Sequence, residues 1–193
     1  MIKLNFLPLN CWNKIVDFAV LSGCNRQQVL EGSIPKDTLD KILSLVSGNG
    51  LQIGGFVGIS HCYLSRNLNG TVCTIDPNIP HRGINNPFLI IKKLVESYNL
   101  QKKSMLICGY AVEQMEILIK QKSQFDFVLL DGNHNLESLK IEIELADKLL
   151  KIGGFLILDD VDYWDGPKKL YEDFNLKYEK IPSTKRAGIL KKL

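Results

Sequence analysis

The cysteines of this sequence show none of the arrangements that stabilise small extracellular proteins. Among 193 residues there are five, an odd number, and no two form a C-x-x-C pair. Some lie inside apolar runs, where a free cysteine behaves as a small hydrophobic residue. This pattern argues against a disulfide framework and indicates a reducing compartment, so we expect a cytoplasmic protein. The cysteines are Cys11, Cys24, Cys62, Cys73 and Cys108.

Long hydrophobic runs are also missing. No stretch approaches the roughly 18 apolar residues that a membrane-spanning helix needs. The segment Met1 to Leu9 is partly apolar, but Pro8 interrupts a run that is already too short for the core of a signal peptide. We therefore expect neither a membrane span nor a membrane partner.

The charge balance lacks the basic surplus of a dedicated nucleic-acid binder. The 24 Lys and Arg residues against 21 Asp and Glu give a net charge of +3, spread along the whole chain. Only the C-terminal tail is locally basic, and we interpret it as a solvated strand pair without a function, the alternative being a patch for an acidic substrate. Its basic residues are Lys177, Lys180, Lys185, Arg186, Lys191 and Lys192.

Strand and helix patterns alternate along the chain. Buried strands are expected at 51–53, 71–75, 104–108, 125–130 and 155–158, and helices at about 39–46, 60–67, 87–96, 112–122, 136–151 and 166–174. We expect Asp37 or Thr38 to cap the first of these helices, Asn86 to cap the third, and Gly153-Gly154 to end the fifth. Two short extended pieces, 177–181 and 187–191, are separated by a turn and predict a hairpin.

Repeated strand and helix units predict an α/β fold with a doubly wound, mainly parallel sheet. We expect seven strands, with the C-terminal antiparallel hairpin closing one edge. The composition, 45% hydrophobic and 23% charged, is that of a globular protein that folds alone. We expect one domain over 1–193, in which a helical lid segment, 1–48, precedes a cofactor-binding core, 49–193.

Ligands of such sheets bind beyond the carboxyl ends of the strands, so the residues there are the candidate site. Gly54 and Gly58 would let the backbone turn tightly against a ligand, and Ser60 at a helix start could receive an anionic group. Asp76 follows the second strand, where a carboxylate can accept both hydroxyls of a ribose. Together they predict a cofactor that contains a nucleoside. The alternative is that Asp76 only caps the turn before Pro77.

A second group of polar residues follows the later strands. Asp131, Asp159 and Asp160 would meet because adjacent parallel strands lie about 4.8 Å apart. Three close carboxylates repel one another, and an oxygen cluster suits Mg²⁺ or a similar divalent cation. Alternatively, these aspartates cap turns and bind backbone. His134 could act as a general base or could cap its helix.

Three blocks of sequence stand out together: QIGGFVGIS at 52–60, FDFVLLDGNH at 125–134 and LLKIGGFLILDDV at 149–161. They resemble the motifs of class I S-adenosylmethionine (SAM)-dependent methyltransferases, in particular the small-molecule O-methyltransferases. The chain departs from the family pattern at Gln52 and Tyr110, where acidic residues are common. The likeness spans roughly 51–161 and implies a Rossmann-like methyltransferase fold.

The resemblance also implies roles for individual residues. Gly54, Gly58 and Ser60 would hold the methionine end of SAM, Asp76 the ribose, and Gly109-Tyr110-Ala111 the adenine, with Asp131 beside the cofactor. A divalent cation on Asp131, Asp159 and Asp160 would position the acceptor, and Asp131 or His134 would take its proton.

We therefore expect methyl transfer to a hydroxyl of a small-molecule acceptor. A metal-independent N-methyltransferase and a catalytically silent cofactor-binding relative are the alternatives, and self-association into a homodimer is left open. An NAD-dependent oxidoreductase is disfavoured because the full G-x-G-x-x-G spacing and a Tyr-x-x-x-Lys pair are missing. Acceptor contacts are expected from a lid formed by 10–21 and 77–85. Four aromatic residues, Trp12, Phe18, Tyr163 and Trp164, could line the acceptor pocket, but core packing is the favoured interpretation for each of them taken singly.

Overall fold

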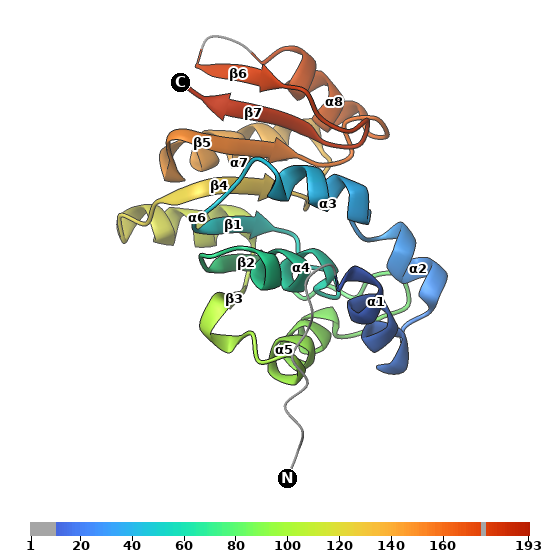
Figure 1. Cartoon of the computed structure of the whole chain (residues 1–193). Helices are drawn as coiled ribbons and strands as arrows, with labels where there is room; N and C mark the ends of the chain where they lie inside the picture. The colour runs from blue at the N-terminus through green and yellow to red at the C-terminus, as the bar shows by residue number, and fades with distance from the viewer. Residues whose placement is uncertain (1–10, 175–176) are drawn as a thin grey trace.

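The computed structural model describes residues 11–174 and 177–193 (Figure 1). Its centre is a seven-stranded sheet in the order β3-β2-β1-β4-β5-β7-β6. The strands are β1 (Gly50–Ile53), β2 (Val72–Asp76), β3 (Ser104–Cys108), β4 (Phe125–Leu130), β5 (Leu150–Leu158), β6 (Tyr178–Ile181) and β7 (Gly188–Lys192). Residues 1–10 lie outside the described residues. They include the partly apolar segment 1–9 and the start of the predicted helical lid segment, 1–48.

The first five strands are parallel to one another, whereas β7 pairs antiparallel with both β5 and β6. This arrangement confirms the predicted α/β class and the C-terminal hairpin at the sheet edge. Within the described residues, no helix is long and apolar enough to cross a membrane.

Helices cover both faces of the sheet, and each face has its own apolar cluster. One cluster packs α1 to α5 against the sheet, and the other packs α6, α7 and α8 against the opposite face. The helices are α1 (Trp12–Leu21), α2 (Arg26–Glu31), α3 (Lys36–Leu43), α4 (Ile59–Asn67), α5 (Pro87–Ser97), α6 (Ala111–Lys120), α7 (Leu136–Leu149) and α8 (Asp165–Glu172), with a short 3₁₀ helix at Gln101–Lys103. This is the doubly wound arrangement that alternating strands and helices predict.

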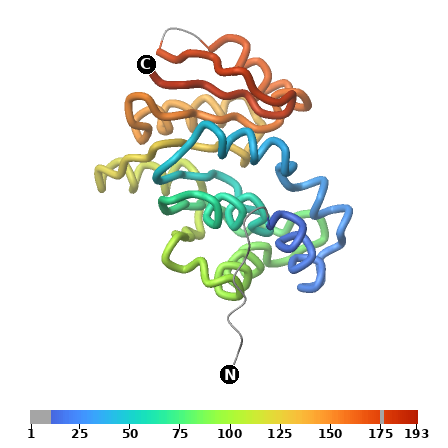
Figure 2. Tube along the Cα trace, viewed as in Figure 1, coloured from blue at the N-terminus to red at the C-terminus, as the bar shows by residue number. Residues whose placement is uncertain are grey.

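The N-terminal helices reach the end of the sheet where the parallel strands finish. Figure 2 shows the blue segment around α2 beside the green part of the chain that precedes α5. The two are joined by an ion pair, Arg82 Nη1 to Glu31 Oε2, at 3.1 Å. Two of the four aromatic residues, Trp12 and Phe18, pack against the apolar cluster of this face, which agrees with the core packing favoured for them.

Two of the predicted helix ends are wrong. Pro35, not Asp37 or Thr38, is the N-cap of α3, and the Asp37 carboxylate accepts a hydrogen bond from Thr38 N–H inside the first turn. Helix α7 ends at Leu149 because Leu150 is already extended and pairs with Phe125 of β4. The predicted helix stop at Gly153, with its φ of +78°, therefore lies inside β5.

Candidate active site

Strand register aligns the residues that follow β1, β2, β4 and β5. Ile53 pairs with Ile75 on one side and with Leu130 on the other, and Leu130 pairs with Leu158. The next residue along each strand therefore lies on one edge of the sheet, which is the carboxyl edge where such folds bind ligands. These next residues are Gly54, Asp76, Asp131 and Asp159.

A cavity of about 520 Å³ opens at this edge. Seven of the predicted site residues line it: Gly54, Asp76, Tyr110, Ala111, Asp131, His134 and Asp160. Trp164 also lines it, in line with the acceptor-pocket alternative for this residue. The lining does not include Gly58, Ser60, Gly109, Asp159 or Tyr163. The predicted roles of individual residues remain predictions.

The glycine turn after β1 brings two strand ends into close contact. Gly54 has a φ of +86°, and a β-carbon built on it would lie 2.0 Å from the carbonyl oxygen of Asp131. Gly58 has a φ of +88° at the start of α4, where a β-carbon would approach Ile91 to 3.1 Å. Both positions need glycine, since other residues rarely adopt this backbone region and the space at Gly54 is filled.

Asp76 holds the same turn from the end of β2. Its Oδ2 accepts hydrogen bonds from Gly55 N–H and Phe56 N–H at 2.8 and 3.0 Å, and its Oδ1 accepts one from Asn78 N–H at 2.8 Å. The predicted turn-capping alternative is thus present in the structure. A carboxylate oxygen accepts about two hydrogen bonds, so Oδ1 keeps capacity for one ribose hydroxyl. The ribose role stays a prediction.

Gln52, the departure from the family pattern, supports the turn from below. Its amide nitrogen donates to the Gly54 carbonyl oxygen at 2.8 Å. Its amide oxygen lies 3.5 Å from the Thr74 hydroxyl, which in turn contacts His61 Nδ1 at 2.7 Å. Burial lowers the pKa of His61 to about 3, so this histidine is neutral at neutral pH. A neutral Gln52 therefore suits a fully buried, uncharged polar chain.

The three predicted aspartates do meet, but a cation from the protein already lies among them. Arg186 Nε donates to both Asp159 oxygens at 3.0 and 2.9 Å, and Arg186 Nη2 donates to Asp159 Oδ2 at 2.6 Å. The same Nη2 lies 3.1 Å from Asp160 Oδ1. Burial and the charge of neighbouring Asp159 raise the pKa of Asp131 well above its usual range, so the protonated form of Asp131 is favoured.

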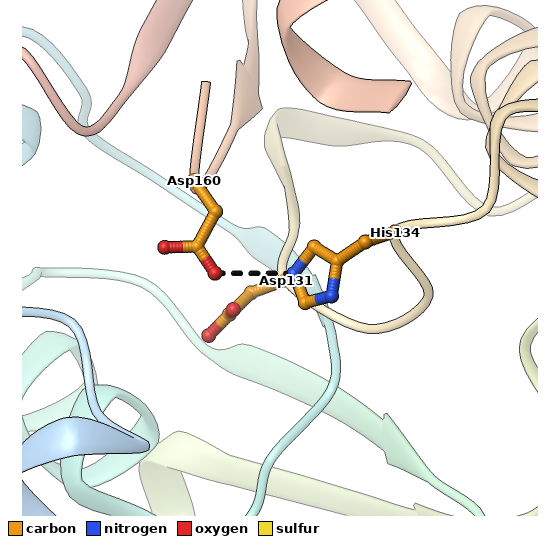
Figure 3. A group of neighbouring side chains, drawn as sticks. All are labelled: Asp131, His134 and Asp160. Atoms are coloured by element: carbon orange, nitrogen blue, oxygen red, sulfur yellow. Dashed lines mark ion pairs between the residues drawn. The ribbon is translucent and has the colours of Figure 1, made fainter. Parts of the chain in front are cut away.

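His134 lies at the mouth of this group and points toward Asp160 (Figure 3). Its Nε2 is 3.2 Å from Asp160 Oδ2, and its ring stacks on Trp164 with the centroids 5.4 Å apart. Side-chain atoms of Asp131, His134 and Asp160 lie within 4.8 Å of one another. Although burial opposes it, His134 and Arg186 together lower the pKa of Asp160, which is therefore ionised.

Two residues of the site escaped the sequence analysis. Arg186 was interpreted as part of a solvated tail, and only the hairpin's pairing with β5 brings it to Asp159. Glu142 lies in α7, lines the cavity and is buried, and its Oε2 has no hydrogen-bond partner among the described residues. Burial raises its pKa to about 7. Its spacing from Leu139 and Ala146, which face the core, could have shown that it is buried.

The chain is similar to a known protein family in sequence and to solved structures in fold. A sequence profile for the methyltransferase domain matches residues 51–161. No curated protein sequence matches the chain.

Solved structures give the same picture at the level of the fold. A protein from Staphylococcus aureus, provisionally assigned as a caffeoyl-CoA O-methyltransferase, superposes with a TM-score of 0.70 at 21% identity, over 94% of this chain and 91% of that one. An O-methyltransferase from Bacillus cereus in complex with SAH superposes with a TM-score of 0.70 at 18% identity, over 94% and 90%. TomG, an O-methyltransferase from Streptomyces achromogenes involved in tomaymycin synthesis and solved with SAM, gives 0.63 at 17%, over 93% and 86%.

Proposed function

The chain belongs to the methyltransferase domain family, of the class I fold, and we propose that it transfers a methyl group from SAM to a hydroxyl of a small molecule. The observation that carries this proposal is the cavity at the carboxyl edge, which is lined both by the glycine turn and Asp76 and by the group of Asp131, His134 and Asp160. The O-methyltransferases of the same fold that were solved with SAH or SAM support the choice of cofactor.

SAM would lie along the glycine turn. The backbone around Gly54 would contact its methionine end, with Gly58 and Ser60 shaping the turn and helix start. Asp76 Oδ1 would accept a ribose hydroxyl. The adenine would lie beside Tyr110 and Ala111, which line the cavity after β3, with Gly109 giving the backbone of that loop room. Tyr110 is 61% exposed, so its ring is free to cover a purine from the solvent side.

Methyl transfer needs the acceptor oxygen, the methyl carbon and the sulfur in line, and most of the acceleration comes from that alignment. The acceptor hydroxyl must also lose its proton. His134 is the group best suited to take it, because its Nε2 lies 3.2 Å from Asp160 Oδ2, a contact that orients the ring within the site. Asp131 is the second candidate, although its raised pKa means that it must first release its own proton.

The three aspartates predicted to bind a divalent cation interact with Arg186 instead. A site made by Asp131, Asp159 and Asp160 does not fit this arrangement, because both oxygens of Asp159 accept hydrogen bonds from Arg186. The atoms that remain for an ion come from Asp131, His134 and Asp160, and one oxygen of Asp160 also lies against Arg186. We therefore derive no step of the reaction through a metal ion.

The proposed function is tested by incubating the purified protein with SAM that carries a labelled methyl group and a panel of catechol, sugar-hydroxyl and matched amine acceptors. We expect SAH to form together with a methylated hydroxyl product. His134→Ala should lower kcat by roughly 100-fold or more while SAM affinity is kept, because only proton removal is lost. Methylation of amines alone would favour the N-methyltransferase alternative. SAM binding without any product would favour the silent relative.

A further inference from the structure

The position of Arg186 suggests more than a structural ion pair. Its side chain is 21% exposed and lines the cavity, whereas the side chain of Asp159 is completely buried. The backbone of Arg186 is also fixed, since its carbonyl accepts a hydrogen bond from Val161 N–H at 2.9 Å. The guanidinium is thus held between the end of β5 and the start of β7, against Asp159 and Asp160 and in the lining of the cavity.

Three carboxyl groups, those of Asp131, Asp159 and Asp160, surround one permanent positive charge. The nearby aspartates raise the pKa of Arg186 above its ordinary value against the effect of its burial, so it stays charged at every working pH. A guanidinium presents five N–H donors, and those on Nε and Nη2 go to Asp159 and Asp160. No hydrogen bond of the two Nη1 N–H groups is formed among the described residues, and Arg186 lines the cavity, so these two groups are the donors left for a ligand there.

A divalent cation is disfavoured next to this group for an electrostatic reason. At a given distance the guanidinium repels a divalent ion about twice as strongly as it repels a single positive charge, and the repulsion is stronger near a protein than in bulk water. An ion on Asp160 would lie within a few ångströms of Arg186, whose Nη2 is 3.1 Å from Asp160 Oδ1. The negative charge that would attract an ion is already balanced in part by the arginine.

From this geometry we infer that Arg186 takes the place of a divalent cation in this active site and binds the acceptor oxygen as that oxygen loses its proton. The inference rests on the proposed function. In the step, the O–H bond of the acceptor breaks and its proton goes to His134. The oxygen then forms a bond to the methyl carbon while the bond from carbon to sulfur breaks, which leaves neutral SAH. Arg186 stabilises the negative oxygen through Nη1 and is unchanged at the end.

The test begins with the wild-type protein, so that it does not depend on a variant that folds. Mn²⁺ is titrated into the protein with bound SAM, and binding is followed by the loss of the electron paramagnetic resonance signal of free Mn²⁺. We expect no specific binding at millimolar Mn²⁺ and an unchanged methylation rate in excess chelator. Stoichiometric binding of Mn²⁺ to the wild type, or loss of the activity in chelator, would overturn the inference.

A variant then tests the role of Arg186 itself. Arg186→Gln removes the charge and should lower kcat by roughly 100-fold or more with SAM affinity unchanged, since one donor to a developing oxyanion is lost. It should also gain Mn²⁺ binding, because the aspartates lose their counter-charge. Lys185→Gln removes one positive charge at the exposed neighbouring residue and is the control for net charge. It should change neither kcat nor the binding of Mn²⁺. Full activity of a folded Arg186→Gln would overturn the inference.

Two further measurements keep the outcomes distinct. If Arg186→Gln does not fold because Asp159 is left unpaired, the double variant Asp159→Asn/Arg186→Gln removes the buried charge, and the same loss of kcat is expected. SAM affinity is measured in every sample. Failure of SAM to bind the wild type would refute the proposed function, whereas the Mn²⁺ titration concerns Arg186 alone.

Discussion

Single residues at the carboxyl edge were predicted where one short segment carries the signal. Gly54 and Asp76 stand directly after buried strands, so sequence alone places them at the site, and the structure shows their contacts. Arg186 could not be found in this way, because its role depends on a pairing between β5 and β7 that brings distant segments together. Asp159 was found at the edge, but its partner was not.

The turn at Gly54 leads to a prediction with a built-in control. Gly54→Ala should destabilise the protein by roughly 3 kcal/mol or more and abolish SAM binding, since a left-handed backbone and a clash with the Asp131 carbonyl act together. Gly23 also has a positive φ, +99°, but nothing lies within 4 Å of a β-carbon there. Gly23→Ala should therefore cost only about 1 kcal/mol, for the backbone alone. If urea denaturation gave the same loss of unfolding free energy for Gly54→Ala and for Gly23→Ala, the proposed clash at Gly54 would be refuted.

At the scale of elements, most helices and strands follow from periodicity and capping residues. Asn86 caps α5 through a hydrogen bond from Leu89 N–H, as its position before Pro87 predicts. The boundary between α7 and β5 was wrong because local propensity favours helix through Leu150, whereas pairing with β4 extends it. A strand pairing that overrides local helix propensity cannot be predicted from the sequence of one segment alone.

The buried contact between α4 and β2 gives a pH-dependent prediction. His61 on α4 is neutral in the fold, with its pKa lowered to about 3, whereas in the unfolded chain it takes up a proton near pH 6.5. The contribution of neutral His61 to the free energy of unfolding is therefore complete above pH 6.5. It is lost by about 1.4 kcal/mol per pH unit as the pH falls toward 3. The difference in unfolding free energy between wild type and His61→Gln should shrink accordingly between pH 7 and 5.

The control for this measurement is His81→Gln, since His81 is exposed and the difference from wild type should change much less with pH. The raised pKa of Glu142 makes its contribution to stability fall as the pH rises, which is opposite to the effect of His61. Because Glu142 is present in both wild type and His61→Gln, its effect cancels in the difference between them. A pH-independent difference for His61→Gln would contradict the account of a neutral buried histidine.

At the scale of the whole molecule, the sheet order places the glycine turn, the loop after β3, the acid group and the hairpin around one cavity. The sequence predicted the class of fold and the edge used for binding, because repeated βα units leave few alternatives. It could not predict which helices border the cavity. Of the helical segment predicted as a lid, Glu31 and Gly32 reach the lining, while the buried residues of α1 pack into the core.

The central claim, that this cavity binds SAM, is tested most directly by titration calorimetry with SAM, SAH and NAD on the wild-type protein. We expect SAM and SAH to bind at one site per chain and to compete with each other, and NAD to give no binding heat. Asp76→Ala should weaken both ligands, whereas Asp173→Ala, at an exposed aspartate, should not. Binding of NAD, or the absence of any SAM binding by folded protein, would contradict the account.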